Sequence, residues 1–222
     1  MTDAPDLGPP LVLPLGDSGL LVRFADSLGD AANRAAIAFA RVLQEQMPHG
    51  VIEVDPNLVS VLLTYDPAKT GFEALAGEVR LLIGASRNEI EAGREHRIAV
   101  RFGGEEGPDL DAAASALGLR PEEFIEQHNR LPLRVLATGF APGFVYCGFH
   151  PEGLDIPRRA DVRRSVPAGT VLLAARQTAI AATTVPTGWH VIGRTAFRNF
   201  NPANDPPTVL AAGDELRFEV QA

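Results

Sequence analysis

The segment LRVLATGFAPGFVYCGF, residues 133–149, decides how the C-terminal half of this 222-residue chain is interpreted. Two short runs rich in apolar and β-forming residues are separated here by glycine and proline, the pattern of strands joined by tight turns. The pattern recurs in GTVLLAA, TAIAATTV, WHVIGRTAF and DELRFEV. Many short strands with this punctuation favour a strongly curved sheet, so we predict a small β-barrel or sandwich.

The N-terminal part alternates between helical and strand patterns. Residues 30–47 repeat apolar side chains at helical spacing, and a second helix is expected to begin near Thr70. Strands are predicted at residues 19–24, 51–54, 58–65 and 96–102. The resulting order of strand, helix, strand, strand, helix, strand is the ferredoxin-like pattern. We therefore expect an α+β chain of two domains, residues 1–93 and 94–222, with the boundary in the polar stretch 87–95.

Composition and charge exclude several classes of protein. The chain is 45% hydrophobic and 22% charged, a globular balance that excludes a disordered chain. Its net charge of −8 argues against nucleic-acid binding, which needs a basic surface. No apolar run approaches the roughly 20 residues of a membrane span, and the acidic start MTDAPDLGPP lacks the features of a secretory signal, so we expect a cytoplasmic protein. A single cysteine, Cys147, excludes an internal disulfide framework and a multi-cysteine zinc site, and no metal site is evident.

Four arginines lie within seven residues in the segment IPRRADVRRSVPAGT, residues 156–170. They are Arg158, Arg159, Arg163 and Arg164. Clustered guanidinium groups suit the recognition of carboxylates or phosphates. In an acidic chain they can equally pair with the protein's own carboxylates, and both interpretations stay open.

Other motifs also have two interpretations each. The loop GFAPGFVY, residues 139–146, can line a pocket or form a packed turn, and the only tryptophan, in PTGWHVIGRT, can be a ligand platform or core. Gln177 can donate hydrogen bonds to a bound carboxylate or amide. Cys147 and His150 are three residues apart, but nothing in the sequence shows that the two side chains meet. The stretch FGGEEGPDL, residues 102–110, fits no phosphate-binding spacing and is interpreted as a turn before a helix.

At these same motifs the chain resembles a bacterial family. LGDSGLLVRF, VSVLLTYDP, FGGEEGPDL, PEEFIEQH, GFAPGF, IPRR, VPAGT, GWHVIGRT and AAGDELRF stand in the order and spacing of the family that includes the B-type subunit of 5-oxoprolinase, allophanate hydrolase subunit 1 and the kinase inhibitor KipI. The resemblance implies a ferredoxin-like N-terminal domain followed by a cyclophilin-like β-barrel. It also implies a partner, the homologous C-type or KipA-like subunit, with which such chains form a carboxyltransferase domain in urea carboxylase.

The function that the resemblance implies is that of a B-type subunit in an ATP-dependent amidohydrolase. Together with the C-type subunit and a lactam-opening A-type subunit, it would convert 5-oxoproline to glutamate. ATP would be used by the complex, because this chain contains no recognisable ATP site. Two alternatives are a KipI-type regulator that inhibits a sensor histidine kinase, and a carboxyltransferase-like subunit that acts on a urea derivative with a biotinylated partner.

The resemblance also implies a set of substrate-binding residues, although it identifies no catalytic residue. In the implied roles Arg158, Arg163 and Arg194 hold a carboxylate or phosphate, Gln177 orients an amide, and the loop of residues 139–144 shapes the pocket wall. The full set is His128, Phe140, Pro142, Gly143, Phe144, Tyr146, Arg158, Arg163, Gln177, Trp189, Arg194 and Thr195.

The chain departs from the family pattern around this set. Val162 stands where proline is usual, Ala181 and Ala182 replace a usual Tyr-Pro pair, and Thr187 replaces a glycine. A lost tyrosine removes both a polar group and a large contact surface. The departures therefore suggest an altered ligand, or a subunit whose partner carries the catalysis.

Overall fold

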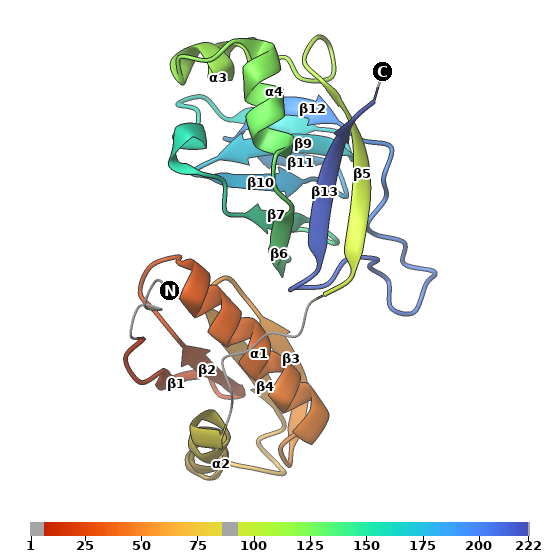
Figure 1. Ribbon diagram of the computed structural model, residues 1–222. Helices are drawn as coiled ribbons and strands as arrows, with labels where there is room; N and C mark the ends of the chain where they lie inside the picture. Colours follow the sequence, from red (N-terminus) through yellow and green to blue (C-terminus); the bar gives the residue numbers. More distant parts are fainter. Residues whose placement is uncertain (1–6, 86–92, 222) are drawn as a thin grey trace. The chain divides into compact units, whose positions relative to one another are not determined.

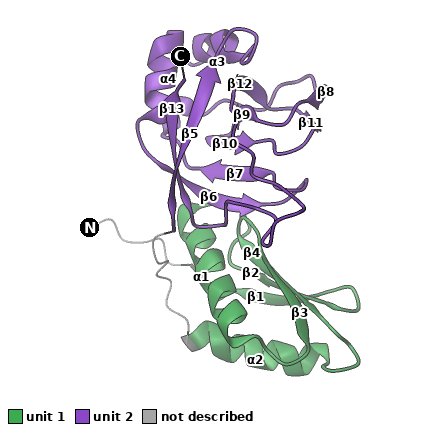
Figure 2. Cartoon of the chain, turned by 90° about the vertical axis from the view of Figure 1, so that its right-hand side faces the viewer, with its two compact units in different colours: residues 1–92 green, residues 93–222 purple. Residues whose placement is uncertain are grey.

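The computed structural model describes residues 7–85 and 93–221. It divides the chain into two compact units, Met1–Ala92 and Gly93–Ala222 (Figure 2). Residues 87–92 of the stretch in which we expected the domain boundary lie outside the described residues.

Unit 1 is a four-stranded antiparallel sheet with two helices (Figure 1). The strand order is β1-β2-β4-β3, and the first and longest helix, α1, packs against β3 and β4. Its alanines allow the helix to approach the sheet closely, while Phe39 and Leu43 fill the core. The elements are β1 (Leu11–Leu15), β2 (Gly19–Arg23), α1 (Asp30–Gln46), β3 (Val51–Pro56), β4 (Ser60–Tyr65) and α2 (Phe72–Ala85).

The strand predicted at residues 96–102 is present as a strand, but its place in the ferredoxin-like order is wrong. This strand belongs to unit 2, and β1 takes the edge position beside β2 in its place. The pairing is antiparallel and runs from Leu11 opposite Arg23 to Leu15 opposite Gly19. Because β1 contains Pro14, its sequence does not look like a strand, yet proline is tolerated on an edge strand.

Unit 2 is a closed seven-stranded barrel, which confirms the predicted α+β fold with a C-terminal β-barrel. Its strand order is β10-β7-β6-β13-β5-β12-β9, and one pair, β5 with β13, is parallel. The barrel strands are β5 (Glu95–Phe102), β6 (Leu133–Thr138), β7 (Val145–Gly148), β9 (Thr170–Ala174), β10 (Gln177–Ile180), β12 (His190–Arg194) and β13 (Glu215–Val220). The other elements are α3 (Leu110–Ala116), α4 (Pro121–Asn129), the short helix η1 (Glu152–Leu154), and β8 (Arg163–Val166) paired with β11 (Val185–Thr187).

Side chains on the two faces of the barrel strands form separate apolar clusters. Along β9, Val171 and Leu173 join the cluster to which all seven barrel strands contribute, which is the barrel interior. The intervening Leu172 belongs to an outer cluster with Val166 of β8 and Val185 of β11. The small β8–β11 sheet therefore covers part of the outer face of the barrel.

None of the helices within residues 7–85 and 93–221 combines the length and apolar character that a membrane span requires.

Candidate functional site

A row of four aromatic side chains runs along the outer face of the barrel. Phe140, Phe144, Tyr146 and Trp189 follow one another with ring centroids 5.5, 4.9 and 5.9 Å apart. The guanidinium carbon of Arg158 lies 5.8 Å from the centroid of the Trp189 ring, within the range of a cation–π contact. We call these five residues the aromatic row, and all five belong to the set of twelve predicted from the sequence.

The loop before β7 fixes the exposed end of this row. The Gly139 N–H donates to the Phe144 carbonyl at 3.0 Å, which closes the loop. Phe140 has a φ of +72° and is 70% exposed, whereas Phe144 is buried. The buried Asn199 amide donates to the Gly143 carbonyl at 2.8 Å, and Gly143 itself has a φ of +69°. The loop is thus held firmly while it presents one phenyl ring to solvent.

Strand β10 lies beside the row and carries Gln177. Ala179 pairs with Tyr146 across the β10–β7 ladder and Gln177 pairs with Gly148, so Gln177 and Ala179 share the face on which Tyr146 lies. Burial raises the pKa of Tyr146, although the charge of Arg158 opposes that rise. Ala181 stands where the family usually has tyrosine, so this face lacks that aromatic ring. The alanine side chain is fully buried in the outer cluster.

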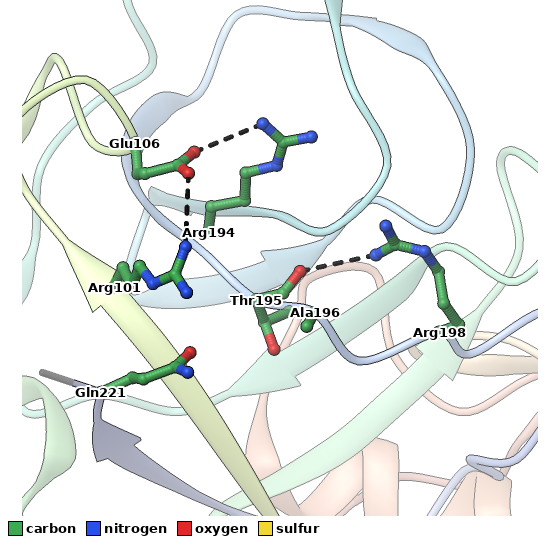
Figure 3. Close-up of a pocket in the computed structure, with 7 residues that line it drawn as sticks. All are labelled: Arg101, Glu106, Arg194, Thr195, Ala196, Arg198 and Gln221. Atoms are coloured by element: carbon green, nitrogen blue, oxygen red, sulfur yellow. Dashed lines mark hydrogen bonds and ion pairs between the residues drawn. The ribbon is translucent and has the colours of Figure 1, made fainter.

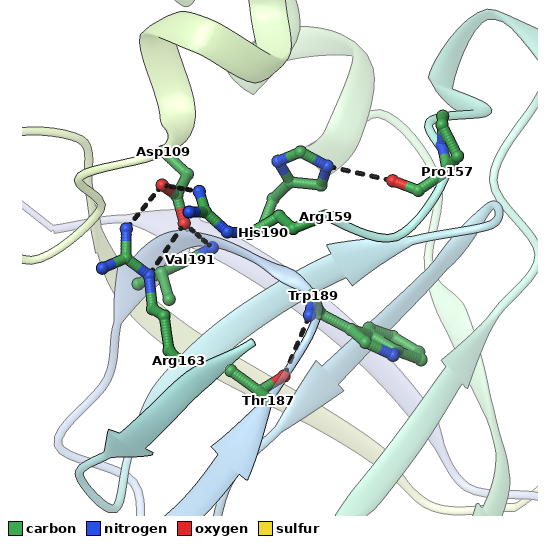
Figure 4. A network of polar contacts seen from close by, with 8 residues as sticks. All are labelled: Asp109, Pro157, Arg159, Arg163, Thr187, Trp189, His190 and Val191. Carbon is green, nitrogen blue, oxygen red and sulfur yellow. Dashed lines mark hydrogen bonds and ion pairs between the residues drawn. The ribbon is translucent and has the colours of Figure 1, made fainter. Parts of the chain in front are cut away.

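Two arginines of the predicted cluster are bound by Asp109, a buried residue that the sequence interpretation missed (Figure 4). Arg159 Nη1 and Arg163 Nη2 lie 2.5 and 2.6 Å from Asp109 Oδ1, and the Val191 N–H donates to Oδ2 at 2.9 Å. Burial alone would raise the pKa of Asp109. The hydrogen bonds from Arg163 and Val191, with the two guanidinium charges, outweigh burial and lower that pKa. Of the two interpretations of the arginine cluster, pairing with the protein's own carboxylates is therefore correct for Arg159 and Arg163.

His128 lies in the barrel interior, away from the aromatic row. Its Nε2 and that of His150 lie 2.8 and 2.7 Å from the Thr178 hydroxyl oxygen, and its Nδ1 lies 2.7 Å from Asn129 Oδ1. Because the Asn129 oxygen can only accept, the His128 Nδ1–H donates, and its Nε2 accepts from Thr178. Burial lowers the pKa of His128 to about 4 and that of His150 well below its usual range, so both rings are neutral at pH 7.

The Cys147 thiol shares this interior and does not have the character of a nucleophile. The side chain is fully buried, and burial raises the pKa of the thiol. A nucleophilic cysteine instead needs a lowered pKa and access to its substrate. The Cys147–His150 pair considered from the sequence therefore lacks the thiolate that such chemistry requires.

The structure thus distributes the predicted site residues over four places. His128 is in the barrel interior, and Arg163 is held by Asp109. Arg194 and Thr195 line a pocket of about 190 Å³ (Figure 3), and Arg194 also lines a second pocket of about 150 Å³ together with Arg163. The remaining residues lie on the aromatic row, its loop or the adjoining strand β10, and they are Phe140, Pro142, Gly143, Phe144, Tyr146, Arg158, Gln177 and Trp189. Over residues 7–85 and 93–221, no three His, Cys, Asp or Glu side chains are grouped so as to hold a metal ion.

Comparison with known proteins places this architecture in a family. The family described as carboxyltransferase domain, subdomain C and D, matches residues 10–210. The chain belongs to this family. The carboxyltransferase-domain match agrees with the resemblance noted from the sequence motifs, and its curated relatives carry the 5-oxoprolinase name expected there.

Individual relatives of the carboxyltransferase-domain family align along most of the chain. The B-type subunit of 5-oxoprolinase from Bacillus subtilis is 34% identical over 215 residues, which cover 92% of this chain and 90% of the relative. The solved structure of TTHA0988 superposes with a TM-score of 0.80 at 32% identity over 92% of this chain, which corresponds to only 40% of the TTHA0988 chain. The urea amidolyase of Kluyveromyces lactis gives a TM-score of 0.77 at 15% identity over the whole chain and 15% of the amidolyase, a likeness of fold alone.

Proposed function

We propose that this chain is the B-type subunit of a multi-subunit, ATP-dependent amidohydrolase that opens the lactam of 5-oxoproline to give glutamate. The observation that carries the proposal is the 34% identity to the B-type 5-oxoprolinase subunit of Bacillus subtilis over 92% of this chain. The proposal includes a homologous C-type subunit and a lactam-opening A-type subunit as partners. ATP is consumed by the complex, and we assign no ATP site to the aromatic row.

The chemistry of the aromatic row suits a small cyclic amide with a carboxylate. The exposed ring of Phe140 and the half-buried ring of Tyr146 offer apolar surface, whereas Phe144 and Trp189 are buried. The exposed Arg158 has no ion pair with any described residue, so its charge is available to a carboxylate. Gln177 is largely buried, at 9% exposed, and its amide can hydrogen-bond a lactam that reaches it. Arginine suits this task because its planar donors match a carboxylate in two places at once.

The row itself contains no group that activates a nucleophile. Tyr146 has a raised pKa, and the histidines of the barrel interior are buried, neutral and bound to Thr178. We therefore assign binding and orientation to this chain, while the water addition across the amide C–N bond takes place with groups from the partner subunits.

The test is reconstitution of the complex from its three subunits. Glutamate formation and ATP hydrolysis are measured with 5-oxoproline as the varied substrate, and assembly is checked by size-exclusion chromatography. Replacing Arg158 by Ala should lower kcat/KM by about tenfold or more, because a hydrogen bond to a charged group contributes roughly 1.5–3 kcal/mol. The matched control is Arg97→Ala, which removes an exposed arginine whose surface ion pair with Glu219 contributes little.

Two results would contradict the proposal at different points. Unchanged kcat/KM in the fully assembled Arg158→Ala complex would remove Arg158 from the substrate site. A wild-type complex that assembles but releases no glutamate from 5-oxoproline would refute the substrate. In that case, recovery of a sensor kinase with the tagged chain from native cells would favour the regulatory alternative.

A further inference from the structure

A pocket of unit 2 away from the aromatic row gathers positive charge that the proposed function does not use. It is the pocket of about 190 Å³ beside the ends of β5, β12 and β13 (Figure 3). Arg101, Arg194 and Arg198 line it together with a single carboxylate, that of Glu106. Three guanidinium groups and one carboxylate leave an excess of two positive charges at this place in a chain whose net charge is −8.

Glu106 occupies the position of an anion between two of these arginines. Its Oε2 lies 3.3 Å from Arg194 Nη1, and its Oε1 lies 4.0 Å from Arg101 Nη1. The Glu106 side chain is 34% exposed, so water competes for it and the pairing is weak. A carboxylate held loosely between two guanidinium groups marks a place where an external anion can compete.

Arg198 supplies a third cation with no carboxylate of its own. Its Nη1 donates to the carbonyl oxygens of Thr195 and Phe197 at 3.5 and 3.3 Å, and no described acid pairs with it. These weak contacts hold the guanidinium at the rim of the pocket and leave its charge uncompensated. Gln221 reaches the pocket from the end of β13 and adds an amide donor.

We propose that this pocket binds a divalent oxyanion, carried as the phosphoryl group of a small molecule. Three guanidinium groups that line one pocket supply more donors than the single carboxylate can use, whereas the three terminal oxygens of a phosphoryl group can accept from several of them. The volume is well above the roughly 30 Å³ that one water occupies in the liquid, so a phosphoryl group has room. The proposal does not rest on the amidohydrolase activity, because the isolated chain is sufficient to bind the anion.

The structure predicts effects of opposite sign for two substitutions. Arg198→Ala removes the uncompensated cation and should weaken binding of inorganic phosphate by about tenfold. Glu106→Gln removes the competing carboxylate and should tighten binding several-fold. The control Arg34→Ala deletes the same charge from an exposed ion pair on α1 of unit 1, and it should leave the affinity unchanged.

Isothermal titration calorimetry on the isolated full chain tests the proposal. Inorganic phosphate and acetate are compared at constant ionic strength, and circular dichroism verifies that each variant is folded. Saturable binding of phosphate that exceeds that of acetate and responds as described would support the site. Absence of saturable phosphate binding, equal affinity for acetate, or equal effects of Arg198→Ala and Arg34→Ala would overturn it.

Discussion

Replacing Asp109 by Ala should destabilise unit 2 substantially, because one buried carboxylate joins two arginines near the start of β8 to the Val191 amide of β12. Arg159 lies in the loop before β8, Arg163 begins β8, and the Val191 amide is in β12. Removal of the carboxylate leaves two guanidinium groups without their partner and a buried N–H without an acceptor.

The expected loss in the free energy of unfolding depends on how exposed the two arginine side chains are. Breaking a fully buried ion pair costs about 3–5 kcal/mol. The Arg159 and Arg163 side chains are 26% and 34% exposed, so water compensates them in part and we take about 2 kcal/mol for the charges. The orphaned Val191 N–H adds about 1 kcal/mol. A total of about 3 kcal/mol corresponds to a fall in Tm of roughly 6–12 °C.

The assay is thermal unfolding followed by tryptophan fluorescence. The single tryptophan, Trp189, lies two residues from Val191 and therefore reports on this region. Asp111→Ala is the control, because Asp111 is an exposed acid in the first turn of α3. A Tm for Asp109→Ala within 2 °C of the control would refute the reasoning. Since the pKa of Asp109 is lowered in the folded state, its stabilisation is present at neutral pH and is lost as the pH falls below the usual carboxyl range.

Two further predictions concern the barrel interior and the aromatic loop. Burial lowers the pKa values of His128 and His150 in the folded protein, so below about pH 6.5 the unfolded chain binds more protons than the folded one. The free energy of unfolding is therefore greatest above this pH and falls as the pH is lowered. Urea unfolding at pH 5 should give a free energy about 2 kcal/mol below that at pH 7 from His128 alone, and His150 lowers it further in the same direction. A pH-independent value would contradict the burial of neutral histidines. Gly143→Ala should cost about 2 kcal/mol or more, because φ is +69° and the new Cβ would lie 2.5 Å from Phe200 Cβ. Gly104→Ala is the matched control, with a φ of +54° and open space around its Cβ, and similar thermal stability of the two variants would show that the contact is not limiting.

Local patterns predicted the elements better than the partners of the strands. The helix predicted at 30–47 is α1, Asp30–Gln46, and the strand predicted at 58–65 is β4, Ser60–Tyr65. The strand at 96–102 was also found, but it was assigned to the wrong sheet. Its parallel partner β13 lies about 120 residues further along the chain, and no local pattern carries that pairing.

For the candidate site, the sequence identified the loops but not what lies between them. The aromatic loop and the tryptophan segment were singled out, and the structure brings them together through the contact of Tyr146 with Trp189. Asp109 was passed over because it stands in a turn, where aspartate is ordinary, and its burial depends on arginines some 50 residues away. Each interpretation of the arginine cluster applies to some of its members. Arg159 forms an ion pair with Asp109, whereas Arg158 lies over the Trp189 ring and pairs with no described carboxylate.

The parallel pairing of β5 with β13 also has a consequence for synthesis on the ribosome. Strand β5 leaves the exit tunnel first among the barrel strands, and its partner β13, Glu215–Val220, leaves last. All strand pairings of the unit 1 sheet lie within residues 11–65 and can form early, whereas the barrel cannot close until β13 emerges. During that interval β5 has an unpaired edge that can join other strands, so the incomplete chain is prone to aggregation until β13 has emerged.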